Sequence, residues 1–215
     1  RRFFIPQYLK NIYRQNYLGD IEIVIADDGL EPIDDLLAKD GRIRYFKFED
    51  RKTLGFKRNF LAEQAKGQIL IHFDDDDYYP PNRVNNAVQM LSKSECLIAG
   101  SSMMYMYNAL INKICTSGPF GPNHATAGTF AYKREYLEKC SFDNEKLAQE
   151  EPGFTNGFAE PMIQLDPKST ILVMQHRLNT WDKANTSQTP SNLTLKDFMR
   201  DPVDIRFYKK LGMPK

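Results

Sequence analysis

Length, composition and charge exclude several classes of protein. The chain has 215 residues, 41% hydrophobic and 27% charged, which is typical of a single globular domain. The net charge of +1 predicts no basic surface for nucleic acid, and no stretch reaches the ~20 apolar residues of a membrane span. The three cysteines lie far apart and fit neither a disulfide framework nor a CxxC metal site, which favours a cytoplasmic setting.

The first part of the sequence alternates between helical and strand patterns. We expect helices at 3–17, 32–38, 55–66 and from 80 onward, and strands at 21–26, 43–48 and 68–73. Successive βα units of this length predict an α/β fold with a mostly parallel central sheet and helices on both of its faces.

After residue 95 the elements become shorter. We expect strands at 96–100, 103–107, 111–115, 126–132 and 170–174, and a helix at 134–139. Residues 193–211 carry apolar side chains at helical spacing. This tail is predicted to pack back on the domain; the alternative is an amphipathic membrane helix, which its mixed charges disfavour. No linker divides the chain, so we predict one domain over 1–215.

Two predicted strands end in carboxylates. Four consecutive aspartates, Asp74 to Asp77, follow the strand 68–73, and Asp27-Asp28 follows the strand 21–26. Adjacent anions repel each other unless a cation neutralises them, and oxygen ligands suit Mg²⁺ or Mn²⁺. Because the carboxyl ends of parallel strands meet at one sheet edge, both clusters are expected to face one crevice that holds a nucleotide and a metal. The alternative is a solvated acidic turn.

Two common phosphate-binding motifs are missing from the sequence. It contains no GxxxxGK[ST] loop, which a P-loop NTPase would need, and no GxGxxG dinucleotide fingerprint. Phosphates would therefore be neutralised by a metal and by cationic side chains.

Three motifs, in this order, resemble a known family. They are Glu22-Ile-Val-Ile-Ala-Asp-Asp-Gly29, then Gly55-Phe-Lys-Arg-Asn59, then Gly67-Gln-Ile-Leu-Ile-His-Phe-Asp-Asp-Asp-Asp77 with Pro81-Asn-Arg83. Together they resemble GT-A fold glycosyltransferases of family 2, in particular the small enzymes encoded by chlorella viruses, which would act in the host cytoplasm. The family also has a first strand that ends in a Thr-Tyr-Asn-like element, and we expect that strand to lie outside this sequence.

The resemblance implies roles for the matched residues. Asp28 would contact the nucleotide base, and Arg58 would approach the nucleotide. Aligning Pro81-Asn-Arg83 with the family pattern implies that Asp76 binds the metal and that Asp74 or Asp75 contacts the ribose. Asp74 is a second candidate metal ligand, and Asp77 would cap or orient the others.

The resemblance also implies a catalytic carboxylate in the second half of the chain. The candidates are Glu150 and Glu151, with Glu151 preferred. An inverting transfer needs a carboxylate to remove the proton of the acceptor hydroxyl. The sequence after this pair departs from the family pattern, so a solvated pair that opens a helix is the alternative.

Further candidates are less specific. His176 follows a late apolar strand, where related enzymes place a metal- or phosphate-contacting histidine. Phosphate or acceptor contacts are also candidate roles for Arg177, Lys183, Trp181, Gly128 and Thr129.

The predicted activity is an inverting, metal-dependent transfer of a hexose or deoxyhexose from a nucleotide-diphosphate sugar, with UDP and Mn²⁺ or Mg²⁺ expected, to a hydroxyl of a glycan acceptor. Residues 1–95 would form the nucleotide-binding half and residues 96–215 the acceptor-binding half. Two alternatives remain open: a noncatalytic sugar-nucleotide-binding domain of a longer chain, and a sugar-phosphate nucleotidyltransferase.

Overall fold

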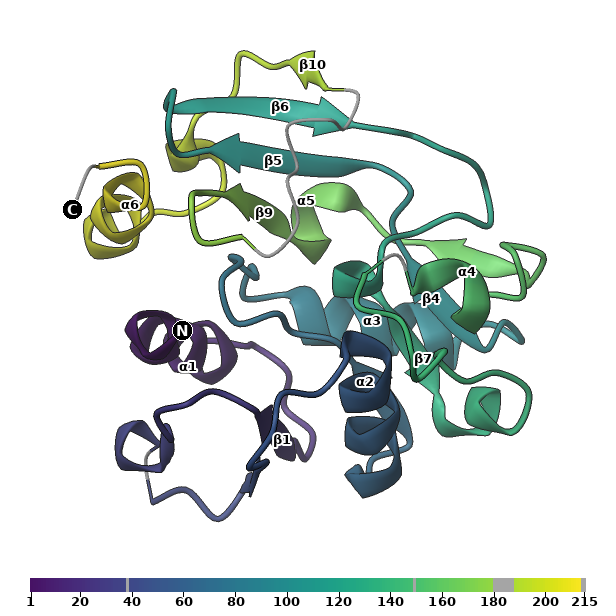
Figure 1. The fold of residues 1–215 in the computed structure, drawn as a ribbon. Coiled ribbons are helices and arrows are strands. Elements are labelled where there is room, and N and C mark those ends of the chain that lie inside the picture. The colour runs from purple at the N-terminus through teal and green to yellow at the C-terminus, as the bar shows by residue number, and fades with distance from the viewer. Residues whose placement is uncertain (38, 149, 180–187, 214–215) are drawn as a thin grey trace.

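A computed structural model describes residues 1–37, 39–148, 150–179 and 188–213 (Figure 1). The α-helices are α1 (Ile5–Tyr13), α2 (Leu54–Gln64), α3 (Arg83–Ser92), α4 (Glu151–Phe154), α5 (Pro167–Thr170) and α6 (Pro202–Lys210). The strands are β1 (Ile23–Asp27), β2 (Ile43–Lys47), β3 (Ile69–Ile71), β4 (Ile98–Gly100), β5 (Met104–Asn108), β6 (Lys113–Ser117), β7 (Ala131–Lys133), β8 (Met162–Gln164), β9 (Leu172–Gln175) and β10 (Thr189–Pro190). Short 3-10 helices are η1 (Arg2–Phe4), η2 (Asp34–Leu36), η3 (Ala127–Thr129), η4 (Arg134–Glu138) and η6 (Leu195–Asp197).

The strands form three hydrogen-bonded sheets, with the orders β1-β2, β3-β7-β4-β8 and β10-β6-β5-β9. The predicted alternation of helix and strand is confirmed for the first part of the chain. The predicted parallel character is wrong in detail, because three of the seven described strand pairings are parallel and four are antiparallel. The cause is the second half, where β6 returns beside β5 as a hairpin and β7 runs between β3 and β4.

Some predicted elements have a different local structure. The strand expected at 126–132 begins instead as η3, and strand pairing starts only at Ala131. The Thr129 hydroxyl donates to the Thr126 carbonyl at 2.6 Å and accepts from the Ser101 N–H at 3.0 Å, which holds the turn. The expected helices near 32–38 and 134–139 are the 3-10 helices η2 and η4, and residue 38 lies outside the described residues.

The acidic loop, defined here as Asp74–Asp77, begins where the pairing of β3 stops. Ile71 lies opposite Ala131 of β7, and the His72 N–H donates to the Phe130 carbonyl at 3.0 Å, one residue beyond the strand. At Asp74 the backbone N–H turns away and donates to the Tyr79 hydroxyl at 2.8 Å. The loop is thus anchored to the rigid end of a strand.

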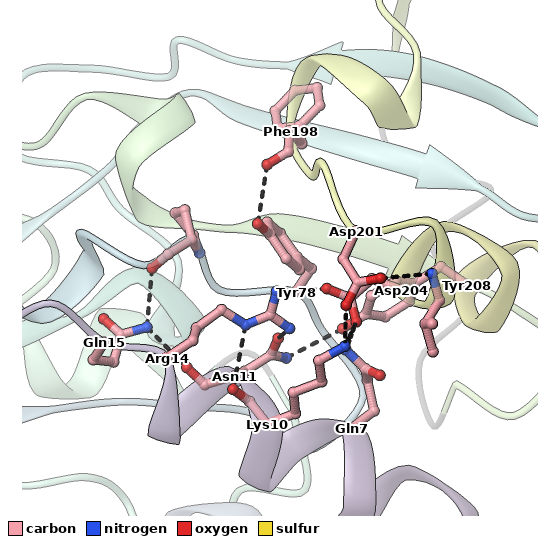
Figure 2. A network of polar contacts seen from close by, with 12 residues as sticks. Gln7, Lys10, Asn11, Arg14, Gln15, Tyr78, Phe198, Asp201, Asp204 and Tyr208 are labelled. Carbon is pink, nitrogen blue, oxygen red and sulfur yellow. Dashed lines mark hydrogen bonds and ion pairs between the residues drawn. The ribbon is translucent and has the colours of Figure 1, made fainter.

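The first and last helices lie side by side and are joined by polar contacts (Figures 1 and 2). Asp204 of α6 is fully buried, and its carboxylate accepts from Gln7 at 3.0 Å, from Lys10 at 2.7 Å and from Arg14 at 2.5 Å. Lys10 also donates to Asp201 at 2.5 Å. The expectation that the tail packs back on the domain is therefore confirmed. None of the described helices is both long and apolar enough to cross a membrane.

We expect Asp204→Asn to lower the free energy of unfolding by about 3 kcal/mol, because removing one partner leaves a buried charge network uncompensated. Asp201→Asn is the matched control: its carboxylate is 40% exposed, and asparagine still caps α6. The control should cost less than about 1 kcal/mol. Urea unfolding of both variants measures the difference, and equal losses would contradict the assignment.

Candidate active site

The two aspartates at the end of β1 have different surroundings. Asp27 shapes the turn, because its carboxylate accepts from the Gly29 N–H at 2.8 Å and from the Tyr45 hydroxyl at 2.7 Å. Asp28 instead accepts from the Lys57 ammonium at 3.0 Å and from the Lys52 N–H at 3.1 Å. Although burial opposes the shift, these hydrogen bonds bring the pKa of Asp28 below its ordinary value, so the carboxylate is charged at neutral pH.

The four carboxylates of the acidic loop have four different sets of contacts. Asp74 is the most exposed and lies 3.5 Å from Arg58. Asp75 and Asp76 each lie 2.6 Å from the Arg1 guanidinium, and Asp76 is buried. Asp77 is also buried, and its carboxylate accepts from the Met174 N–H of β9 at 2.7 Å.

Burial and like charges act together on the pKa of one member of the acidic loop. Burial, together with the neighbouring charges of Asp76 and Asp74, raises the pKa of Asp75 to about 6, although the Arg1 cation opposes the shift. A site with this excess of negative charge favours an added cation.

Arg58 of α2 joins the acidic loop to the predicted catalytic carboxylates. Its Nε donates to Glu150 at 2.7 Å, its Nη1 lies 2.9 Å from His72 Nδ1, and its Nη2 lies 3.5 Å from Asp74. The close approach of α2 requires Gly55, since a Cβ there would lie 1.9 Å from the Asp143 carbonyl oxygen. Arg58 was predicted to approach the nucleotide. In the structure it is buried among protein groups and borders the cavity described below.

The two candidate bases, Glu150 and Glu151, differ in burial and in their contacts. Glu150 is almost fully buried and is held by Arg58. Glu151, the first residue of α4, is half-buried and accepts from the Ala127 N–H at 3.1 Å. Burial and the Glu150 charge raise the pKa of Glu151 above its ordinary value. A raised pKa is what a carboxylate needs to act as a general base near neutral pH.

His176 lies beside Asp76, as a shared site requires. Its Nε2 lies 3.3 Å from the Asp76 carboxylate, and its ring stacks on Phe4 with centroids 5.1 Å apart. The Leu178 N–H donates to Nδ1 at 3.1 Å, which places the hydrogen of the neutral ring on Nε2, facing Asp76. Asn179 also donates to the Asp76 carboxylate, at 3.3 Å.

The remaining phosphate or acceptor candidates differ in their surroundings. Gly128 approaches the acidic loop so closely that a Cβ would lie 2.7 Å from an Asp74 carboxylate oxygen. Thr129 is fully buried and bonds to backbone, an environment that leaves no surface for an acceptor. Arg177 is exposed to solvent. Trp181 and Lys183 lie outside the described residues.

Both acidic strand ends border one cavity of about 1570 Å³. Its lining includes Asp28, Lys57, Arg58, the acidic loop and Asn179. The expected shared crevice is confirmed, but the geometric reason was wrong, because β1 and β3 belong to different hydrogen-bonded sheets. The cavity is large enough for a nucleotide sugar, since ligand pockets typically measure about 300–1,000 Å³. Glu150 and Glu151 are absent from its lining, and Glu150 connects to it through Arg58.

The residues present fit a divalent cation that is shared with a phosphate. Within the described ranges, no three His, Cys, Asp or Glu side chains form a group that could hold a metal by themselves. Mg²⁺ is usually bound by one or two carboxylates together with waters and substrate phosphates, so Asp76 with Asp74 or Asp75 is a sufficient protein contribution. The raised pKa of Asp75 is consistent with such a site.

Two polar residues of the cavity were not identified from the sequence. Lys57 contacts Asp28, and Asn179 contacts Asp76. Lys57 lay in a quoted motif next to Arg58, and only the orientation of α2 decides which of the two reaches Asp28. Asn179 follows His176 by three residues, and its N–H donates to the His176 carbonyl, so a turn brings both side chains to Asp76.

This fold, with its cavity at two acidic strand ends, defines a GT-A type transferase domain. The chain belongs to glycosyl transferase family 2, whose family model matches residues 3–137. A search of curated proteins found no match.

Solved structures support the fold. Residues 1–349 of S. aureus TarS in complex with UDP-GlcNAc match with a TM-score of 0.63 at 16% identity, over 81% of this chain and 56% of that one. The mannosyltransferase PcManGT from Pyrobaculum calidifontis, in complex with GDP-Man and Mn²⁺, matches with a TM-score of 0.56 at 18% identity, over 79% of this chain and 52% of that one. This chain thus spans little more than half of either relative. At these identities the likeness shows the GT-A fold, which confirms the predicted fold class.

A double-mutant cycle tests the Arg58–Glu150 pair. We expect Arg58→Leu and Glu150→Gln to be coupled by about 2 kcal/mol in urea unfolding, because either change alone leaves a buried charge unpaired. The matched cycle of Arg58→Leu with Asp74→Asn should give well under 1 kcal/mol, since that contact is longer and Asp74 is 36% exposed. Equal coupling in both cycles would contradict the assignment of Arg58 to Glu150.

Proposed function

We propose that this domain is an inverting, metal-dependent glycosyltransferase. It moves a hexose or deoxyhexose from a nucleotide-diphosphate sugar, with UDP as the expected nucleotide, to a hydroxyl of a glycan acceptor. The observation that carries the proposal is the cavity onto which Asp28, Arg58 and the acidic loop converge. Family 2 membership supports a transferase. The complexes of similar fold contain UDP-GlcNAc and GDP-Man, which supports a nucleotide-sugar donor.

The donor would bind between the two acidic strand ends. Asp28 accepts hydrogen bonds from the base, and Asp74 or Asp75 accepts them from the ribose. Asp76 is the principal metal ligand, and Asp74 is the second. The metal, Mn²⁺ or Mg²⁺, supplies positive charge that offsets the charge developing on the leaving diphosphate.

His176 would act on the same site through Asp76. Because its Nε2 faces that carboxylate, it orients Asp76; to join Asp76 as a metal ligand, its hydrogen would have to move to Nδ1 and the bond from the Leu178 N–H would have to open. Arg177, Lys183 and Trp181 are proposed for the diphosphate or the acceptor, and so is Gly128, which lies beside Asp74.

Glu151 is the proposed general base. Its carboxylate takes the proton of the acceptor hydroxyl while that oxygen forms a bond to the anomeric carbon. The bond between this carbon and the diphosphate oxygen breaks at the same time, and the nucleoside diphosphate leaves with the bonding electrons. Attack from the opposite face inverts the anomeric configuration. Glu150 supports Glu151 by holding Arg58 and by raising the Glu151 pKa through its charge.

Residues 1–95 are the proposed nucleotide-binding half, and residues 96–215 the acceptor-binding half. The likeness to chlorella-virus enzymes and a cytoplasmic location are kept as hypotheses that the matches above do not test. A noncatalytic nucleotide-sugar-binding domain and a nucleotidyltransferase remain the alternatives. The latter would release pyrophosphate from a nucleoside triphosphate, and the proposed transferase releases a nucleoside diphosphate.

Thermal unfolding with UDP, GDP, CMP and dTDP, each with and without Mn²⁺, tests the donor site. One nucleotide at ~100 times its Kd should stabilise the wild type by about 2.7 kcal/mol. We expect this gain to require Mn²⁺ and to disappear in Asp76→Asn. A shift that is the same in Asp76→Asn would argue against Asp76 as the metal ligand.

Turnover of the donor, followed by release of nucleoside diphosphate, tests the base. Glu151→Gln should lower kcat by about 10²- to 10⁴-fold with little change in donor affinity, because only proton transfer is lost. In the wild type, activity should rise with pH through a pKa above the ordinary carboxyl value, because Glu151 must be deprotonated and its pKa is raised. Glu150→Gln is the matched neighbour. If it lost more kcat than Glu151→Gln while still folded, the order of the two residues would be reversed.

A further inference from the structure

Asp77, the last residue of the acidic loop, is held by three separate elements. Its backbone carbonyl accepts from Asn11 of α1 at 3.0 Å and from the Tyr208 hydroxyl of α6 at 3.2 Å. Its carboxylate accepts from the Met174 N–H of β9. Asn11 and Tyr208 are both about 1% exposed, so water cannot replace either donor without opening the core.

The two donors are themselves fixed. Asn11 Nδ2 also donates to the Tyr208 hydroxyl at 3.1 Å, and Arg14 donates to Asn11 Oδ1 at 2.7 Å (Figure 2). Arg14 in turn is bound to the buried Asp204. The ion pairs between α1 and α6 therefore end in two aligned donors that converge on one carbonyl oxygen.

The contact with β9 sets the register of the acidic loop against the strand that carries His176. Besides the bond from Met174, the Tyr78 N–H donates to the Leu172 carbonyl at 3.1 Å, and the Leu172 N–H returns a bond to Tyr78 at 2.9 Å. Asp77 and Met174, which are hydrogen-bonded to each other, thus lie one residue after Asp76 and two residues before His176. A shift of the Asp77 backbone would change the separation of Asp76 and His176.

We propose that Asn11 and Tyr208 form a clamp that positions the metal-binding carboxylate of Asp76 through the backbone of Asp77. Both are positioning residues, since they act through Asp77 and touch neither metal nor donor. Tyr208 lies in α6, beyond the residues 3–137 that the family model matches, so the clamp extends the site into a part of the chain that the family assignment does not cover. The inference rests on the proposed function in one respect, that Asp76 binds a metal.

The test compares Tyr208→Phe and Asn11→Leu with a matched control, Tyr107→Phe. Tyr107 of β5 is equally buried, and its hydroxyl donates at 2.9 Å to Oδ1 of Asn112, which lies in the turn between β5 and β6. Free Mn²⁺ is measured by its electron paramagnetic resonance signal during titration. We expect the Kd for Mn²⁺ to rise about fivefold in Tyr208→Phe, the change that corresponds to one hydrogen bond, and further in Asn11→Leu. The control should bind as the wild type does.

Hydrogen exchange of the metal-free proteins provides a readout that needs no metal. Amides of residues 74–78 should exchange about fivefold faster in both clamp variants, while those of β5 and β6 stay unchanged. Unchanged exchange at 74–78, or a uniform acceleration over the whole chain, would overturn the clamp. If the wild type binds Mn²⁺, clamp variants that bind it with the same Kd would overturn the clamp as well. If the wild type binds no Mn²⁺, the metal site of the proposed function falls, and the exchange data still decide whether the clamp holds the loop.

Discussion

Repulsion among four consecutive carboxylates at the end of β3 is the constraint on which the rest of the site depends. The fold gives each of them different contacts: Asp74 faces Arg58, Asp75 faces Arg1, Asp76 faces Arg1, His176 and Asn179, and Asp77 accepts from the backbone of β9. Four identical side chains therefore acquire four environments. The two buried ones are tied to the second half of the chain, which makes the shape of the acidic loop a property of the whole fold.

Arg58 links the charges of the acidic loop to those of the predicted catalytic carboxylates. As a buried cation it must be paired, and it is paired on one side with Glu150 and on the other with Asp74. Glu150 is thereby fixed in place, and its negative charge acts on Glu151. Two adjacent glutamates with separated environments are the arrangement by which proteins divide structural and acid–base roles between like groups.

The acidic loop could be placed from the sequence, but its contacts could not. An apolar run followed by aspartates marks a strand end whatever surrounds it, so the position of the acidic loop could be predicted from local pattern alone. Lys57 and Arg58, by contrast, are neighbours on α2, and only the packing of Gly55 against Asp143 decides which faces Asp28 and which faces Glu150. The strand expected at 126–132 failed for a similar reason, since the β-prone composition there is overridden by the tertiary contacts of Thr129.

The contacts of α6 make the completion of the fold a condition for the geometry of the acidic loop. Asn11 and Tyr208 are separated by 197 residues and meet at a carbonyl that lies between them in sequence. Contacts of such high sequence separation carry the full entropy of closing the intervening chain, so they form only when the domain already holds both ends in place. The proposed clamp therefore positions Asp76 only in a domain whose first and last helices have docked. Helix α6 thus contributes to the proposed donor site through its contacts with the first helix and with Asp77, although none of its own side chains borders the cavity.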